Sequence, residues 1–439
     1  MMKMEKNKGV ADEEIAEDAA SAKSHGNSNL HQAGRDKKDE FYTQYVDIEK
    51  EVTSYIEYNP DVFRDKTIFC NCDDPFESNF FKFFALKFRE YGLKKLIATN
   101  YDPSPIANTQ LLLWDEPEEP VDTLGDFIKH AYKIELTDIP DMNADGRFGL
   151  EDVEEFLEIE KVKLDRKEPS SVLSLLEGDG DFRSEECVEL LIESDVVITN
   201  PPFSKFREFI AMLVEHEKQL LIIGNMNAIT YKDVFPLIEA NKLWLGPSIS
   251  SGDREFQVPD SYPLRAAGWR IDEQGRKFLR IKGVRWFTNL DHGRRHEPLP
   301  LMTMADNLKY SKHMEIRGKE AYDRYDNYDA IEVPFTDAIP SDYDGVMGVP
   351  ITFLDKYSPE QFEILGATQR GCHERVPDTK KYDDYWEVRP DGTRTGSSGG
   401  KTNENANLAG NDGKKNYFTN LDGREIQSAY QRIFIKKKG

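Results

Sequence analysis

The stretch DVVITNPPF, residues 195–203, decides the fold that we expect for this chain. Its first half is a short run of mostly β-branched residues, which is typical of a strand buried within a parallel sheet. Its second half, Asn200 to Phe203, would then lie at the carboxyl end of that strand, where open α/β sheets carry their chemistry. The stretch therefore predicts both an α/β fold and the position of an active site.

The residue types in this turn suit a planar amine. The exocyclic amino group of adenine is a poor nucleophile, because its lone pair is delocalised into the ring. The side-chain oxygen of Asn200 and the carbonyl oxygen of Pro201 could accept hydrogen bonds from its two hydrogens, and Pro202 stiffens the turn. Phe203 offers a flat surface on which an extruded base can stack. An ordinary turn is the alternative, since asparagine and proline favour turns for local reasons.

Strands alternate with helices on both sides of this stretch. We expect helices at 41–56, 80–88, 187–193 and around 206–214, and strands at 67–72, 95–99, 195–199, 220–223 and 242–245. This alternation predicts an α/β domain with a mostly parallel, doubly wound sheet.

Shifts in composition divide the chain into regions. Residues 1–36 have almost no large apolar side chains, so we predict a disordered tail. The catalytic domain then extends over 37–300, and residues 103–170 form an acidic insertion at its edge. From 301 onward the regular pattern fades, apart from a strand-like run at 345–354, and we expect a recognition region over 301–439.

The net charge of −23 argues against attraction of nucleic acid by the whole protein, but the charge is uneven. Residues 111–170 contain 18 acidic against 7 basic side chains. Residues 401–439 contain 8 basic against 4 acidic side chains, including Lys436, Lys437 and Lys438. The C-terminal end could therefore face a phosphate backbone while the acidic segment points away.

The sequence predicts a cytoplasmic protein without a membrane segment. No apolar run is long enough to cross a bilayer, and the first residues lack the apolar core of a signal peptide. The four cysteines, Cys70, Cys72, Cys187 and Cys372, are too scattered for a disulfide framework or a four-ligand zinc site. We expect reduced, structural thiols.

One segment of the insertion imitates a calcium loop. Asp141, Asn143 and Asp145 fit positions 1, 3 and 5 of an EF-hand, but position 12 is Asp152 in place of the bidentate glutamate. We interpret the segment as an acidic surface turn. The eight histidines lack the spacing of a catalytic zinc site, so we expect no metal.

Residues near the ends of the first helix–strand unit could bind a ligand at the same edge of the sheet. Asp73, Asp74 and Pro75 follow the first strand, and a carboxylate there could hold ribose hydroxyls. Ser78 and Asn79 precede the helix at 80–88, where they suit an N-cap with backbone amides free for an anion. An ordinary capped helix explains these residues equally well.

The loop at 178–182, GDGDF, would lie at this edge too. Asp181 could accept a hydrogen bond from an adenine amino group, and Phe182 could pack on the ring. A solvated turn is the alternative, because glycine and aspartate are both common in turns.

Six segments of the chain occur in the order found in a known family. They are KDEFYTQY at 38–45, FCNCDDP at 69–75, GDGDFRS at 178–184, NPPF at 200–203, LIIGN at 221–225 and NAITY at 227–231. Together they resemble the EcoRI-type adenine-specific DNA methyltransferases, from about residue 37 to the C-terminus and least clearly over 103–170. One departure is the triplet 77–79, ESN, which stands where most methyltransferases have glycines.

This resemblance implies a Rossmann-like methyltransferase fold that uses S-adenosyl-L-methionine as the methyl donor. The implied product is double-stranded DNA methylated on the 6-amino nitrogen of adenine, with base flipping, in restriction-modification or DNA self-protection. The implied setting is a bacterial or phage-encoded intracellular monomer with a cognate restriction endonuclease as partner.

The resemblance also assigns roles to residues. The catalytic residues would be Asn200, Pro201, Pro202 and Phe203. The donor-binding residues would be Phe41, Tyr42, Thr43, Asn71, Asp73, Asp74, Pro75, Ser78, Asn79, Asp181 and Phe182. The segment at 41–43 would close over the donor, and Asp181 with Phe182 would hold its adenine.

Two other classes of function fit parts of the sequence. Asn-Pro-Pro-aromatic pockets also resemble those of methyltransferases that act on RNA adenines, cytosine amino groups or protein glutamines. An acidic, catalytically silent binding protein that imitates phosphate charge is the non-enzymatic alternative.

Overall fold

A computed structural model describes residues 42–101, 131–142, 148–166, 168–250, 253–258, 268–368, 380, 382–398, 403 and 405–438. The tail that we expect at 1–36, Phe41, Cys372 and residues 102–130 lie outside these residues. Nothing in the structure therefore bears on the expectations for those segments.

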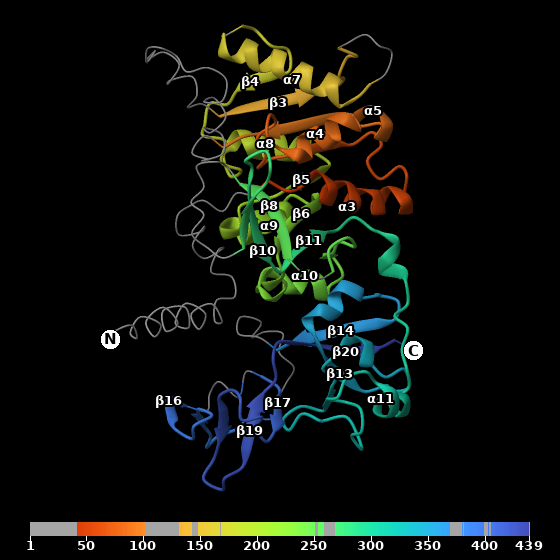
Figure 1. Cartoon of the computed structure of the whole chain (residues 1–439), viewed down its shortest axis with the longest axis vertical. Helices are drawn as coiled ribbons and strands as arrows, with labels where there is room; N and C mark the ends of the chain where they lie inside the picture. The colour runs from red at the N-terminus through yellow and green to blue at the C-terminus, as the bar shows by residue number, and fades with distance from the viewer. Residues whose placement is uncertain are drawn as a thin grey trace, which may run out of the picture.

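An eight-stranded sheet forms the upper half of the molecule in Figure 1, with the strand order β4-β3-β2-β1-β5-β6-β11-β7. Its four central strands are parallel: β1 (Thr67–Cys70), β2 (Lys95–Thr99), β5 (Val196–Thr199) and β6 (Gln219–Asn225). Their side chains are almost all buried, as expected of parallel strands covered on both faces. The α/β class and the central strands confirm the prediction.

The two edges of this sheet are antiparallel, so the expectation of a mostly parallel sheet holds only for its centre. One edge consists of β3 (Tyr132–Leu136) and β4 (Leu173–Leu175), and the other of β11 (Val284–Thr288) and β7 (Trp244–Leu245). Strand β3 comes from the acidic segment and is only partly buried, so no continuous apolar run marks it in the sequence.

Helices pack on both faces of the sheet, which makes it doubly wound. Successive residues of β1 alternate between two buried clusters, because neighbouring side chains of a strand point to opposite faces. Ile68 and Cys70 join residues of α3 and α4, whereas Phe69 joins residues of α8 and α9. The helices are α3 (Tyr45–Tyr58), α4 (Asn79–Leu86), α5 (Phe88–Tyr91), α7 (Leu150–Asp165), α8 (Glu185–Glu193), α9 (Phe206–Glu215) and α10 (Phe235–Glu239).

The first two helices differ from the expectation for local reasons. Helix α3 begins only at Tyr45, because Tyr42 forms an antiparallel bridge with Gln257 and so holds the preceding residues extended. The phenylalanine-rich helix is interrupted at Lys87, and its second part ends at Gly92, which has a positive φ of 63°.

A three-stranded sheet with the order β8-β10-β9 lies between β7 and β11 in the chain. It consists of β8 (Asp253–Val258), β9 (Trp269–Ile271) and β10 (Lys277–Lys282). Gln257 on β8 pairs with Tyr42, so this sheet holds the segment that precedes α3.

The C-terminal region contains two further sheets, which occupy the lower half of Figure 1. The first has the order β12-β13-β20-β14, with β12 (Ala330–Glu332), β13 (Val346–Pro350), β14 (Phe362–Ala367) and β20 (Arg432–Lys437). The second has the order β16-β15-β18-β19-β17 and consists of β15 (Trp386–Val388), β16 (Arg394–Ser398), β17 (Asn407–Ala409), β18 (Tyr417–Thr419) and β19 (Glu425–Ser428). The strand expected at 345–354 is correct as far as Pro350, after which the chain forms a 3-10 helix, η5 (Ile351–Lys356).

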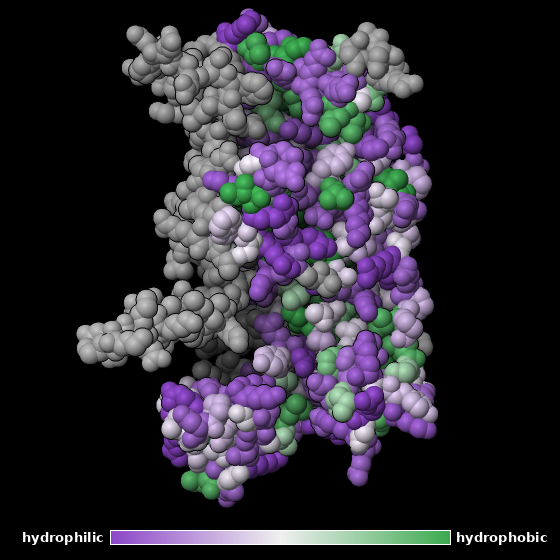
Figure 2. Space-filling view, in the orientation of Figure 1, coloured by the Kyte–Doolittle hydropathy of each residue, from purple (hydrophilic) through white to green (hydrophobic). Residues whose placement is uncertain are grey.

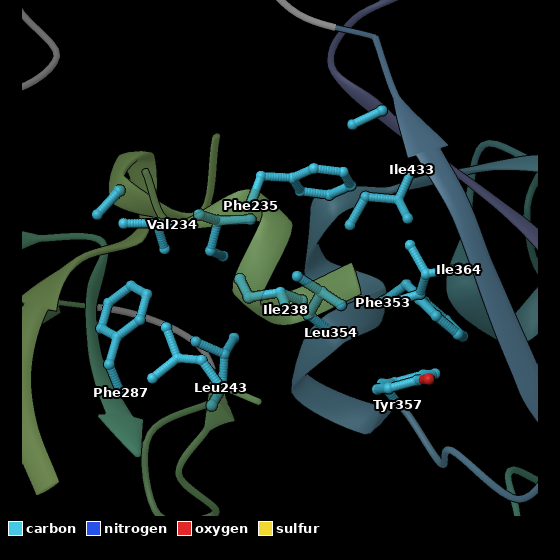
Figure 3. Close-up of a cluster of buried hydrophobic side chains, with 14 of the residues drawn as sticks. Val234, Phe235, Ile238, Leu243, Phe287, Phe353, Leu354, Tyr357, Ile364 and Ile433 are labelled. Carbon is cyan, nitrogen blue, oxygen red and sulfur yellow. The ribbon is translucent and has the colours of Figure 1, made fainter. Parts of the chain in front are cut away.

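The C-terminal region and the large sheet share one buried apolar cluster. Figure 3 shows Phe235 and Ile238 of α10 facing η5, β14 and β20. A buried ion pair crosses the same boundary, since Arg285 of β11 contacts Asp355 of η5, with Nε and Oδ1 2.7 Å apart. The division at residue 300 is therefore not a break in the core, and it remains a prediction.

Among the described residues, no helix is both long and apolar enough to cross a bilayer. Figure 2 shows one face of the molecule, on which hydrophilic side chains predominate and apolar ones are scattered. Scattered apolar side chains are ordinary on protein surfaces.

Candidate functional site

The turn at 200–203 lies where the sequence predicts, directly after β5. Asn200 is buried, and the chain turns through Pro201 and Pro202 into a short 3-10 helix, η1 (Phe203–Lys205), which continues into α9. Phe203 is partly buried and packs against the cluster that contains α4. The turn is thus held between the end of a central strand and the start of a helix.

Asp73 connects this turn with the loop that follows β1. Its carboxylate accepts hydrogen bonds from Ser78 Oγ at 2.7 Å, from Thr199 Oγ1 and from the backbone N–H of Asn200. Burial raises the pKa of Asp73 to about 6, although the hydrogen bonds to Thr199, Ser78 and Asn200 oppose that rise. The buried carboxylate therefore joins the carboxyl ends of β1 and β5.

The neighbouring carboxylate, Asp74, is also engaged within the protein. Its Oδ2 accepts from Tyr132 Oη at 2.8 Å and its Oδ1 from the amide of Phe76 at 2.9 Å. Burial raises the pKa of Asp74, and burial together with the charge of Asp74 raises the pKa of Glu77 to about 7. Because Tyr132 begins β3, the acidic segment contributes directly to this edge of the sheet.

Ser78 caps α4 as predicted, and its side chain occupies two of the backbone amides at the start of the helix. Its Oγ accepts from the amides of Phe80 at 3.1 Å and Phe81 at 3.4 Å. Asn79 is the first residue of α4, and its Nδ2 donates to the carbonyl of Thr43 at 2.8 Å. This bond fastens the segment at 42–44 to the start of α4.

The loop at 178–182 packs against the carboxyl end of β2. Gly180 has a φ of +76°, and a Cβ at this position would lie 2.0 Å from the carbonyl oxygen of Asn100, so glycine is required there. Phe182 is buried, with its ring centroid 5.2 Å from that of Phe209. Asp181 accepts from Arg183, whose ion pair with it lowers the pKa of the Asp181 carboxyl.

Sequence reasoning missed two residues of this edge, Asn100 and Tyr132. Asn100 follows β2 and is buried, and its Oδ1 accepts from the amide of Tyr132 at 2.7 Å. Its position after a predicted strand could have revealed it, because parallel strands place their carboxyl ends at one edge. Tyr132 begins a strand whose alternating apolar and polar residues, YKIEL, could have revealed it, but this strand lies within the acidic segment that we interpreted as an insertion.

Buried polar atoms at this edge fit a polar ligand. Thr43 Oγ1 and Asn71 Nδ2 are buried and have no hydrogen-bond partner within the described part of the chain. Asn71 follows β1 directly, and the carbonyl of Thr43 is bonded to Asn79. Such atoms cost free energy unless a ligand or water satisfies them, so these positions fit the polar groups of a ligand.

The described residues contain no cluster of side chains that could hold a metal ion. Asn143 and Asp145 of the EF-hand-like segment lie outside them. Asp152 is buried, and its carboxylate accepts from the amides of Met142 at 2.8 Å and Gly149 at 2.7 Å. Its oxygens are thus used in fixing the backbone around α7.

The basic C-terminal end forms a central strand of the four-stranded sheet. Strand β20 lies between β13 and β14, and Lys437 Nζ donates to the carbonyl of Ser341. Lys438 Nζ donates to the carbonyl of Pro359 at 2.6 Å. Two of the three terminal lysines therefore fasten the strand to its own domain.

The chain is similar to known proteins over most of its length. A family model described as "Adenine-specific methyltransferase EcoRI" matches residues 29–438. The Type II methyltransferase M.EcoRI of Escherichia coli is 43% identical over 339 residues, which cover 77% of this chain and 89% of that protein. The Type II methyltransferase M.MpnI of Mycoplasma pneumoniae is 33% identical over 340 residues, covering 76% and 84%. No solved structure matches the chain.

Proposed function

The chain belongs to the EcoRI family of adenine-specific methyltransferases, and from this premise we propose that it methylates the 6-amino nitrogen of adenine in double-stranded DNA. The observation that supports the reaction best is the turn at 200–203, which lies at the carboxyl end of β5 and is bonded to Asp73. In this family the expected role is modification of host DNA within a restriction-modification system.

The proposed chemistry needs two acceptors and close positioning. Asn200 Oδ1 and the carbonyl of Pro201 accept hydrogen bonds from the adenine amino group, which draws electron density back onto its nitrogen. S-adenosyl-L-methionine, when bound, supplies a methyl group already activated by a sulfonium. Holding the amine in line with that methyl group can account for about 7–11 kcal/mol of the barrier.

We propose that the donor binds at the edge formed by β1, β2 and the segment at 42–44, within a Rossmann-like fold. Thr43 and Asn71 are the residues whose buried polar atoms best suit contact with it. Asp74, Pro75, Asn79 and Phe182 shape the site, in keeping with their bonds and their burial. The other assignments by resemblance, including Phe41, Tyr42, Ser78 and Asp181, remain proposals.

Phe203 is proposed to stack on the extruded adenine. Replacing Phe203 with alanine is expected to weaken capture of the target base by roughly 5–150-fold, since base–aromatic stacking is worth about 1–3 kcal/mol. Fluorescence of 2-aminopurine at the target position would measure this loss. Binding to a duplex without a recognition site is the control, and an equal loss there would contradict a role in base capture.

We also propose that the region over 301–439 contributes contacts to DNA. Despite the net charge of −23, binding is then expected to weaken steeply with salt, by about 0.9 in the logarithmic slope for each phosphate contact. Titration of labelled duplex at several salt concentrations measures the slope. A flat response would contradict contact with the phosphate backbone.

The direct test supplies purified protein with labelled methyl donor and, in parallel, duplex DNA, RNA and a protein mixture. Label in DNA that elutes as N6-methyladenine after digestion is the expected result. Label in RNA, in cytosine or in protein would support a different acceptor, and no label anywhere would support a catalytically silent protein. We also propose that the protein acts as a monomer and that a cognate restriction endonuclease is its partner.

A further inference from the structure

The carboxylate of Asp73 is a meeting point of two loops that are distant in the sequence. Its donors are Ser78 Oγ, which also caps α4, and two groups at the end of β5, Thr199 Oγ1 and the amide of Asn200. Thr199 is fully buried, and Asp73 is 8% exposed. The fold therefore fixes the position of this carboxylate through the cap of α4, the end of β5, the turn that follows it and the burial of both side chains.

The three hydrogen bonds favour the ionised form of the Asp73 carboxyl, because each of them lowers its pKa. A carboxylate can accept from three donors at once, whereas a protonated acid donates through one oxygen and so loses an acceptor position. The titratable groups that interact electrostatically with Asp73 are Cys70 and Asp74, and the described residues give Asp73 no salt bridge. A buried charge without a cation is costly, and the hydrogen bonds offset that cost only in part, since the pKa of Asp73 is raised to about 6.

We propose that Asp73 is a positioning residue, which acts through Thr199 and the amide of Asn200 to fix the turn that holds the target amine. The inference rests on the function proposed above and deepens it. The two acceptors proposed for the amine belong to Asn200 and Pro201. Asp73 accepts from the backbone N–H of Asn200 and from the hydroxyl of Thr199, the residue before it. A small displacement of these acceptors would reduce the rate, because catalysis depends on angstrom-scale placement.

The arrangement also couples the two ligand sites. Ser78 belongs to the loop that leads into α4, and Asn79 next to it holds the segment at 42–44 through Thr43. The same carboxylate thus spans the side of the site proposed for the donor and the side proposed for the amine. A residue that merely contacted the donor would have no reason to bond Thr199.

Two variants of the purified protein separate positioning from donor contact. Thr199→Val keeps the shape of the side chain and removes its hydroxyl, and Asp73→Asn removes the charge. We expect each to lower kcat by at least about tenfold, and we expect the double variant to be no slower than Asp73→Asn, since residues in one network are not additive. The dissociation constant for the donor, measured by equilibrium dialysis, should change by less than about threefold in Thr199→Val.

Conservative and remote variants serve as controls. Thr199→Ser keeps a hydroxyl and should recover most of kcat. Ser194 lies just before the amino end of β5, and its buried Oγ donates to the carbonyl of Leu191 at 2.8 Å. Ser194→Ala removes this hydroxyl and should leave kcat unchanged. A Ser194→Ala variant as slow as Thr199→Val would show that general loosening of β5 explains the effect, and it would overturn the proposal.

The pH profile gives a second, independent readout. Because the pKa of Asp73 is about 6, protonation below that pH should remove an acceptor and lower kcat of the wild type on the acid side. Burial also raises the pKa of Glu77 in the wild type, to about 7, so Glu77→Gln tests whether that group causes the decrease. The loss of kcat at acid pH should persist in Glu77→Gln and should disappear in Asp73→Asn. An acid limb that remains in Asp73→Asn would contradict the assignment.

Failure of the inference is distinguishable from failure of the proposed function. If the wild type methylates adenine and Thr199→Val retains full kcat while Asp73→Asn loses donor binding, Asp73 contacts the donor and does not position the turn. If the wild type transfers no methyl group to DNA, the function itself is wrong.

Discussion

Replacing Asn200 with alanine is expected to lower kcat for methyl transfer by at least about 100-fold, the scale seen when one preorganised polar group is removed from an active site. Asn200 follows β5 and is buried at the carboxyl edge of the sheet, and its backbone N–H donates to the carboxylate of Asp73. Its side-chain oxygen is one of the two acceptors proposed for the amino group. Alanine leaves the backbone in place and removes that acceptor.

Transfer of labelled methyl groups to a duplex measures this loss under saturating donor and DNA. The matched control is Asn200→Asp, which keeps an acceptor oxygen at the same position and is expected to be faster than Asn200→Ala. Donor affinity should be nearly unchanged in both variants, since the donor side is formed by other segments. Equal activity of Asn200→Ala and wild type would contradict the catalytic role of the turn.

The second large effect concerns stability and comes from Arg285. Its guanidinium contacts Asp355 through two bonds, Nε to Oδ1 at 2.7 Å and Nη2 to Oδ2 at 3.0 Å, and both side chains are only 4% exposed. Arg285→Ala leaves the carboxylate of Asp355 buried without its cation. We expect the free energy of unfolding to fall by about 3–5 kcal/mol, as when one partner of a buried ion pair is removed.

Urea unfolding measures this change, and the sign of its pH dependence is fixed. Burial raises the pKa of Asp355 and Arg285 opposes that rise, so removal of Arg285 should raise the pKa further. A carboxyl whose pKa is higher in the folded than in the unfolded state lowers the free energy of unfolding as pH rises towards the folded-state pKa. The loss of stability in Arg285→Ala, relative to the wild type, should therefore grow from acid to neutral pH.

The double variant Arg285→Met with Asp355→Leu is the control for this pair. Replacing both partners by apolar residues leaves no buried charge, and it should cost less than Arg285→Ala alone. A loss below about 1 kcal/mol in Arg285→Ala would contradict the view that this pair joins β11 to the C-terminal region.

The parts of the fold that the sequence predicts are those with local signals. The apolar runs of β2 and β5 mark buried strands, and Ser78 caps α4 as its position before an apolar helix indicates. Strand β3 has a short alternation of apolar and polar side chains, YKIEL, but it was missed because it lies within an acidic segment that we interpreted as an insertion. Its place at the sheet edge depends on pairing with β2, which no local pattern specifies.

The candidate site shows the same limit. The position of Asn200 after a strand follows from the sequence, but the bond between Asp73 and Thr199 joins residues 126 positions apart. It requires β1 and β5 to be neighbours in a register that pairs Ile68 with Val196. The sequence likewise predicts Ser78 as the cap of α4, but it does not show that the same hydroxyl donates to Asp73.

The most direct test of the central claim is sequencing of modified bases in DNA from cells that express the protein. We expect N6-methyladenine at a single sequence context in cells with the wild type, and its absence in cells with Asn200→Ala. It would be contradicted by DNA without N6-methyladenine in the wild type, or by the same methylated sites in both.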